Sequence, residues 1–150
     1  MTTTTAQPPI NLQITRLIKA PRERVFAAWT NPADIVKWFG CGDSRAASAK
    51  VDLRVGGEYL IHIKKGTERE FDVRGVYREI KSPSRLVFTW GWFGTEGMDG
   101  EETVVTVDLI DRNGSTEVQL SHDLFTSVES RDGHSFGWNA GLDHMEKFLA

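Results

Sequence analysis

Hydrophobic residues recur at helical spacing near the C-terminus of the chain. From Asp132 to Ala150, the apolar side consists of Trp138, Gly141, Leu142, Met145, Phe148 and Leu149. This pattern predicts an amphipathic helix capped by Asp132, and at about 1.5 Å per residue such a helix crosses a small sheet. Gly137 and Gly141 each cost about 1 kcal/mol relative to alanine inside a helix. Either close packing against a sheet or an unfilled volume beneath the helix would account for them.

Between about Ala46 and His122 the apolar period is two, which is typical of β-strands. The alternation predicts six strands, whose inward residues are Val51, Leu53 and Val55; Tyr59, Ile61 and Ile63; Phe71, Val73, Gly75 and Tyr77; Leu86, Phe88, Trp90 and Trp92; Val105, Val107 and Leu109; and Thr116, Val118, Leu120 and His122. Short turns such as Asn113-Gly114 join most of these strands, so neighbours must be antiparallel. An earlier strand at 10–18, with Ile10, Leu12, Ile14, Leu17 and Ile18, makes seven.

Two short helices are predicted between the first two strands. Pro21 suits a first helical turn, and Val25, Phe26 and Trp29 follow at helical spacing. Asn31-Pro32 is typical of a second cap, with Ile35, Trp38 and Phe39 as the buried side and Gly40 as the stop. The fold class is therefore α+β, a curved seven-stranded antiparallel sheet covered by a long C-terminal helix. We expect a flexible, threonine-rich lead at 1–9 and one domain at 10–150.

Composition excludes several classes of partner. The 150 residues carry a formal net charge of −3, with acids and bases interspersed, so neither nucleic acid nor an anionic membrane surface is expected as a partner. There is no run of about eighteen apolar residues that could span a membrane. The single cysteine, Cys41, fits a reducing compartment, and we expect a cytoplasmic location.

Residues that carry chemistry are sparse. His62, His122, His134 and His144 stand singly, without the spacing that a metal site needs. No phosphate loop, dinucleotide fingerprint or nucleophile motif is present, so no cofactor, metal or catalytic residue is assigned. Cys41 follows Gly40 and is interpreted either as a reactive thiol or as an inert small residue.

The aromatic residues allow two interpretations. Trp38, Phe88, Trp90, Trp92 and Trp138 either fill a core or line a cavity. His122 faces inward and either bonds the backbone or orients a ligand. If Glu79 were buried beside Tyr77 and His122, acid/base catalysis on a polyketide-like ring would become possible. The glycine-rich segment 93–102 is long for a hairpin and is predicted to gate an opening beside Trp92 and Phe93.

Several segments in a fixed order resemble a known family. They are Ala20-Pro21-Arg22-Glu23-Arg24-Val25-Phe26 with Trp29, Asn31-Pro32, Trp38-Phe39-Gly40, Asp52-Leu53-Arg54-Val55-Gly56-Gly57, Gly75-Val76-Tyr77-Arg78-Glu79-Ile80, Arg85-Leu86-Val87-Phe88-Thr89-Trp90, Gly137-Trp138 and Leu142. From about residue 10 to the C-terminus the chain resembles the SRPBCC superfamily, and within it the activator of heat shock protein 90 ATPase homologue-like family. The resemblance implies a helix-grip fold, with a cavity between sheet and helix that in relatives often takes a hydrophobic ligand.

The leading hypothesis is a small hydrophobic-ligand-binding domain without catalysis. The predicted ligand-binding residues are Trp38, Phe71, Tyr77, Phe88, Trp90, Trp92, His122, Trp138, Gly141 and Met145. The resemblance also implies two alternatives, a module that binds a heat-shock chaperone and a cyclase- or dehydratase-type enzyme. The chaperone module would show an exposed apolar patch and no cavity, whereas the enzyme would need paired titratable side chains inside the cavity.

Overall fold

A computed structural model describes residues 10–40, 44–67, 69–94 and 101–150 of the chain. The expected lead at 1–9 lies outside these residues, as do Cys41 and the middle of the expected gate. The elements, in chain order, are β1 (Ile10–Ile18), α1 (Arg22–Thr30), α2 (Pro32–Trp38), β2 (Ser44–Val51), β3 (Glu58–Lys65), β4 (Arg69–Lys81), β5 (Arg85–Phe93), β6 (Glu102–Arg112), β7 (Ser115–Phe125) and α3 (Val128–Phe148).

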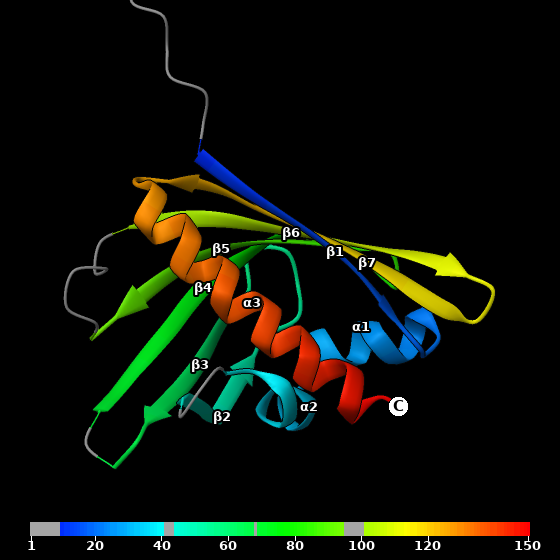
Figure 1. The fold of residues 1–150 in the computed structure, drawn as a ribbon, viewed down its shortest axis with the longest axis horizontal. Coiled ribbons are helices and arrows are strands. Elements are labelled where there is room, and N and C mark those ends of the chain that lie inside the picture. The colour runs from blue at the N-terminus through cyan, green and yellow to red at the C-terminus, as the bar shows by residue number, and fades with distance from the viewer. Residues whose placement is uncertain (1–9, 41–43, 68, 95–100) are drawn as a thin grey trace, which may run out of the picture.

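The strands of the described residues form one seven-stranded sheet in the order β1-β7-β6-β5-β4-β3-β2. Every neighbouring pair is antiparallel, as predicted from the short turns. The sheet curves around α3, which crosses it diagonally, and α1 and α2 lie beside the C-terminal half of α3 (Figure 1). The predicted α+β helix-grip architecture, with two short helices between the first two strands, is therefore confirmed.

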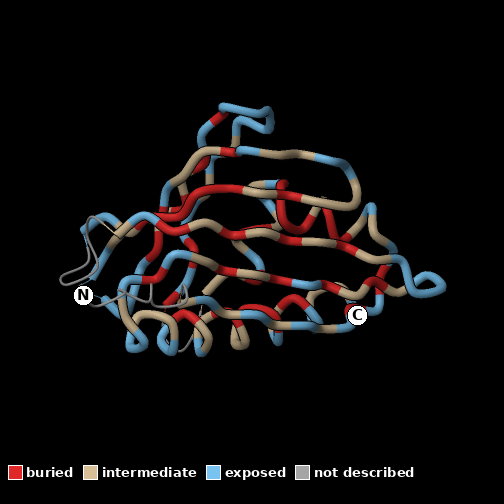
Figure 2. The backbone as a smooth tube through the Cα atoms, turned by 90° about the horizontal axis from the view of Figure 1, so that it is seen from above, coloured by how far each residue is buried: buried red, intermediate tan, exposed pale blue. Residues whose placement is uncertain are grey.

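The core lies between the concave face of the sheet and the helices. Buried positions run along the strands, while exposed positions gather at the turns between them (Figure 2). Val105, Val107, Val118, Leu142 and Met145 are fully buried, so the inner faces of β6 and β7 and the apolar side of α3 belong to one hydrophobic core. Within the described part of the chain, no helix is both long and apolar enough to cross a membrane.

Helix α3 begins earlier than the sequence pattern predicts. Asp132 was expected to cap it, but the helix starts at Val128 and the side chain of Ser127 accepts a hydrogen bond from the Ser130 amide at 3.0 Å. Serine is among the best N-cap residues, because its hydroxyl satisfies an amide that has no partner within the helix. The first turn faces solvent and carries few apolar residues, so hydrophobic periodicity did not reveal it.

Strand β2 ends before the predicted apolar set is complete. Leu53 and Val55 were expected to face inward, but they are 43% and 64% exposed in the turn after Val51. Gly56 adopts φ +86°, and a Cβ on Gly57 would lie 2.1 Å from the carbonyl oxygen of Asp52. The prediction was wrong here because the two glycines allow a tight turn that ends the alternation.

An irregularity in β4 separates Tyr77 from Glu79. The pairing with β5 shifts between these residues, so that Tyr77 is opposite Phe88 and Glu79 is opposite Val87. Such a bulge turns the following side chain to the other face of the sheet. Tyr77 is 4% exposed, whereas Glu79 forms ion pairs at 3.2 Å with Lys81 and Arg85. The buried grouping of Glu79 with Tyr77 and His122 is therefore not formed.

Strand β1 is joined to α3 by a polar contact that the apolar pattern did not predict. Leu17, assigned to the apolar set, is 50% exposed, and Arg16 faces α3 instead. Its guanidinium donates to Asp143 at 2.6 Å, to Glu146 at 3.2 Å and to Asn139 at 3.1 Å. This contact fixes the polar side of α3 against the sheet edge and sets the position of its apolar side.

Candidate functional site

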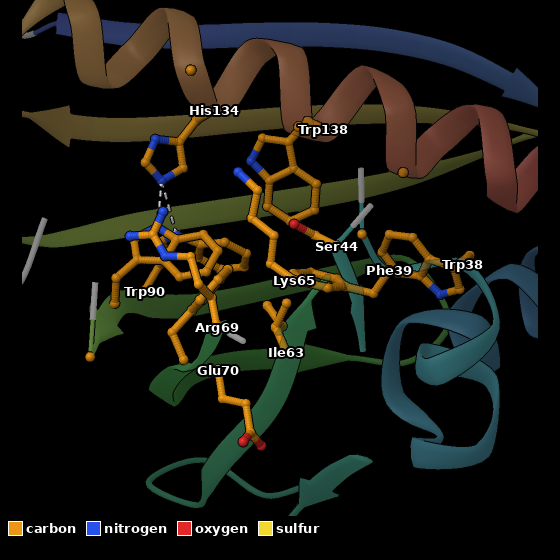
Figure 3. Close-up of a pocket in the computed structure, with 17 residues that line it drawn as sticks. Trp38, Phe39, Ser44, Ile63, Lys65, Arg69, Glu70, Trp90, His134 and Trp138 are labelled. Atoms are coloured by element: carbon orange, nitrogen blue, oxygen red, sulfur yellow. Dashed lines mark hydrogen bonds between the residues drawn. The ribbon is translucent and has the colours of Figure 1, made fainter. Parts of the chain in front are cut away.

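A cavity of about 560 Å³ lies between α3, the end of α2 and the inner face of β3, β4 and β5 (Figure 3). Buried residues form its inner wall, and exposed residues of the β3–β4 hairpin, with Gly94 and Gly133, form its mouth. The lining residues are Trp38, Phe39, Gly40, Ser44, Ile63, Lys65, Arg69, Glu70, Phe71, Trp90, Trp92, Gly94, Gly133, His134, Gly137, Trp138 and Gly141.

The wall of the cavity is built largely from aromatic rings in mutual contact. The ring centroid of Trp90 lies 4.9 Å from that of Trp138 and 5.6 Å from that of Trp92. Phe39 lies 5.8 Å from Trp90, and Phe71 lies 5.4 Å from Trp92. Such tilted and edge-to-face pairs stabilise each other by about 0.5–1.5 kcal/mol beyond their buried area, so the wall is a rigid aromatic surface.

His134 on α3 accepts hydrogen bonds from two of these tryptophans. The indole N–H groups of Trp90 and Trp92 donate to its Nε2 at 3.2 and 2.8 Å (Figure 3). Its Nδ1 lies 2.7 Å from the carbonyl oxygen of Ser130, so Nδ1 carries the proton and the ring is neutral. Burial lowers the pKa of His134, although the Ser130 carbonyl and the charge of Glu101 act in the opposite direction.

His122 on β7 accepts a hydrogen bond from Trp138, as His134 does from Trp90 and Trp92. The Trp138 N–H donates to Nδ1 of His122 at 3.0 Å, and the Nε2 of His122 lies 2.6 Å from the Thr103 hydroxyl. Its side chain is fully buried. Burial, with a smaller contribution from His134, lowers the pKa of His122 to about 2, so the ring is neutral at any physiological pH.

These contacts leave the inner wall of the cavity apolar. The fourth lining tryptophan, Trp38, donates its N–H to the carbonyl of Ala28 at 2.8 Å. The only polar group of each of the four lining indoles is thus paired within the protein. An apolar ligand would therefore meet no unpaired indole N–H at this wall, which favours the burial of apolar surface there.

The predicted ligand-binding residues fall into two groups in the structure. Six of them line the cavity, namely Trp38, Phe71, Trp90, Trp92, Trp138 and Gly141. Tyr77 and Phe88 instead line a separate void of about 20 Å³ deeper in the core. His122 and Met145 are fully buried and support the site from behind. Burial raises the pKa of the Tyr77 phenol, which therefore stays neutral.

The sequence pattern missed several lining residues. Phe39 and Ile63 reach the cavity from α2 and β3, whose relative placement no local pattern fixes. His134 carried a usable signal, because it precedes Trp138 by four residues and so shares its face of α3. Of the two residues expected at the opening, Trp92 lines the cavity, whereas Phe93 lies on the outer face, where the guanidinium carbon of Arg74 is 4.6 Å from its ring centroid.

Comparison with known proteins agrees with this architecture. The family described as Activator of Hsp90 ATPase homolog 1-like protein matches residues 19–150. The chain belongs to this family. Membership in the Activator of Hsp90 ATPase homolog 1-like family confirms the resemblance drawn from the ordered segments. No curated protein matches the chain at a significant level.

Solved structures of similar fold come from several bacteria. Protein CV1439 from Chromobacterium violaceum is 19% identical with a TM-score of 0.80, covering 94% of this chain and 98% of its own. The AHSA1 protein from Silicibacter pomeroyi is 23% identical with a TM-score of 0.81, covering 93% and 97%. CalU16 from Micromonospora echinospora is 24% identical with a TM-score of 0.71, covering 95% and 77%. At these identities the similarity establishes the fold alone.

Proposed function

We propose that this protein binds a small hydrophobic molecule in the cavity between the sheet and α3. The observation that carries the proposal is the largely aromatic wall, in which the indole N–H of each of four tryptophans is engaged in a hydrogen bond within the protein. A volume of about 560 Å³ lies within the usual range for small-molecule sites, about 300–1,000 Å³. Membership in a family whose fold commonly takes hydrophobic ligands supports the same function.

The proposal is tested with a panel of small hydrophobic compounds and two variants of strand β5. A ligand that binds only the folded protein raises the melting temperature, so binders are recognised by their thermal shift. Trp92→Ala removes one wall of the cavity, and we expect it to reduce the shift of any binder by more than half. Phe93→Ala is the matched control, because Phe93 is the next residue of the same strand but lies on the outer face.

The two variants also separate the possible outcomes. Equal shifts in the wild type, Trp92→Ala and Phe93→Ala would remove Trp92 from the site. A panel in which no compound shifts the wild-type melting temperature would contradict the proposal as a whole. Isothermal titration of the strongest binder then gives its stoichiometry, for which one molecule per chain is expected.

A chaperone contact is the second candidate function, because the family takes its name from an activator of Hsp90 ATPase. The surface offers Phe136 on α3, which is 69% exposed. The test measures Hsp90 ATPase turnover with the wild-type protein and with Phe136→Ser. Stimulation by the wild type that Phe136→Ser loses would favour this candidate, whereas unchanged turnover would leave ligand binding as the function.

The enzyme alternative has less support from the site. It requires two titratable side chains that converge on a substrate. Among the described residues, His134 is the one titratable side chain of the inner wall, and both of its ring nitrogens are occupied by hydrogen bonds. The other titratable side chains that line the cavity, Lys65, Arg69 and Glu70, are exposed at its mouth.

A further inference from the structure

We propose that the ligand is an apolar anion, whose apolar part lies against the tryptophans and whose anionic group lies at the mouth beside Lys65 and Arg69. The inference rests on the proposed ligand-binding function of the cavity and adds the charge of the ligand and its orientation. Three observations carry it: the engagement of every indole and imidazole nitrogen at the inner wall, the two cations at the mouth that have no carboxylate partner among the described residues, and the arrangement of charges on the two faces of one hairpin.

The inner wall excludes the polar end of a ligand. The lining indole N–H groups are all engaged within the protein, and so are both nitrogens of His134. A charged group placed in this part of the cavity would lose water without gaining an indole or imidazole N–H as a partner, which is unfavourable. An amphipathic ligand must therefore bind with its polar end toward the mouth.

The mouth carries two cations that face the cavity. Lys65 ends β3 and Arg69 begins β4, and both side chains extend toward α3, whereas the carboxylate of Glu70 points away (Figure 3). Glu70 is bound to the imidazole of His62 at 2.7 Å on the outer face. Neither Lys65 nor Arg69 forms an ion pair with any carboxylate in the described residues.

The register of the hairpin places these two cations directly opposite each other. Lys65 pairs with Arg69, and Ile63 pairs with Phe71 on the same inward face. Like charges at directly opposite positions of an antiparallel pair repel and destabilise it. One residue away, Lys64 is opposite Glu70, so the outer face has the favourable combination. An anion between Lys65 and Arg69 would supply the missing negative charge.

The same arrangement disfavours a cationic ligand. Tryptophan faces can bind quaternary or primary ammonium groups by cation–π contacts, and four such rings line this cavity. Two positive charges at the mouth oppose the entry of a cation and favour that of an anion. The chain as a whole has a net charge of −3, so the positive mouth is a local feature.

Three probes of one chain length test the charge of the ligand: decanoate, decanol and decylamine, each below its aggregation threshold at pH 7.5. Their dissociation constants are measured by isothermal titration with the wild-type protein. We expect decanoate to bind about tenfold more tightly than decanol, because charge-assisted hydrogen bonds to the mouth are added, and decylamine to bind most weakly. Raising the salt concentration should weaken decanoate binding alone.

Two variants of the hairpin identify the cations responsible. Lys65→Gln combined with Arg69→Gln should weaken decanoate about tenfold and leave decanol within about twofold. Lys64→Gln is the matched control, because it removes the same charge from the outer face of the same hairpin and should change neither constant. The melting temperature of the double variant should equal or exceed that of the wild type, since a like-charge pair is removed.

The outcomes distinguish this inference from the function on which it rests. Decanol or decylamine binding as tightly as decanoate, or a double variant that keeps the decanoate affinity, would overturn the anion while leaving the cavity as a ligand site. The anion would also be overturned if the protein bound the compounds of the hydrophobic panel without any preference for the anionic ones. Failure of every compound, charged or neutral, to bind the wild type would instead remove the proposed function.

Discussion

At the residue scale, the tryptophans depend on their hydrogen-bond acceptors. Nε2 of His134 accepts two indole N–H groups, and Nδ1 of His122 accepts a third. A neutral imidazole can donate at one nitrogen and accept at the other, so it satisfies an indole without adding a charge to the core. The sequence revealed the tryptophans, because their alternation along β5 is regular. It did not reveal that His134 and His122 accept the hydrogen bonds of these indoles, because β7 and α3 approach β5 only in the folded chain.

Replacement of His134 tests this dependence. His134→Phe keeps a ring in place but leaves the buried N–H of Trp90 without an acceptor, and an unsatisfied buried donor costs about 1–3 kcal/mol. Urea denaturation should show a loss of unfolding free energy in that range. His144→Phe is the comparison, since His144 is partly exposed and forms one longer contact, 3.3 Å to the Trp38 carbonyl. A loss no greater than that of His144→Phe would mean that water replaces the acceptor.

At the element scale, α3 determines both the extent of the sheet contact and the space left beneath it. Its apolar side was predictable from the spacing of Trp138, Leu142 and Met145, which are all buried. Its start was not, because the capping Ser127 precedes a solvent-exposed turn with little hydrophobic signal. The bulge in β4 was equally hidden, since alternation alone does not show where a strand gains a residue. The sequence thus predicted which face of a helix or strand is buried wherever that face is apolar, but not where the element begins or gains an extra residue.

Gly141 tests how the helix shapes the cavity. A Cβ at this position would lie 3.5 Å from the nearest ring carbon of Trp38, which is ordinary contact. Gly141→Ala should therefore raise the unfolding free energy by up to about 1 kcal/mol through helix propensity. Gly141→Leu should abolish the thermal shift caused by ligands, because the leucine side chain would occupy the part of the cavity next to Trp38.

The control for Gly141 is Gly133, where an added Cβ would meet nothing within 4 Å. Gly133→Ala should give a similar gain in unfolding free energy, and it serves as a control for stability alone because Gly133 lies at the mouth of the cavity. Both stabilities are read from urea denaturation at one temperature. The unfolding free energy could instead fall for Gly141→Ala and rise for Gly133→Ala. That result would show that the Trp38 ring cannot move to make room for a Cβ, and that close packing against Trp38 is the reason for a glycine at position 141.

At the scale of the whole molecule, burial of two neutral histidines makes stability depend on pH. The pKa of His122 is lowered to about 2 by burial, and burial also lowers that of His134. The unfolded chain therefore binds more protons than the folded one below the ordinary histidine pKa of about 6.5. Stability is full above that pH and falls as the pH decreases toward the folded pKa values.

The effect is measurable between pH 6.5 and 5, where the unfolding free energy should fall by up to about 1.4 kcal/mol per pH unit for His122, with a further contribution of the same sign from His134. His122→Asn keeps an acceptor near Trp138 but does not titrate, and it should reduce the slope. Hydrogen bonds with Asp72 and Glu70 raise the pKa of His62, which contributes a slope of the opposite sign, so the comparison of the wild type with His122→Asn isolates the contribution of the buried histidine. If His122→Asn left the slope of unfolding free energy against pH unchanged, the pH dependence could not be assigned to His122.

The pairing of the first strand with the last has a consequence for how the chain is made. Ile18 pairs with Thr116, and the Thr116 hydroxyl donates to the carbonyl of Ala20, 96 residues earlier in the chain. During synthesis β1 therefore leaves the ribosome long before its partner exists, and its hydrogen-bonding edge stays open until β7 has been translated. Pairing of β1 is thus delayed until β7 has emerged. Chains that stall before β7 expose a strand edge that can join other nascent chains.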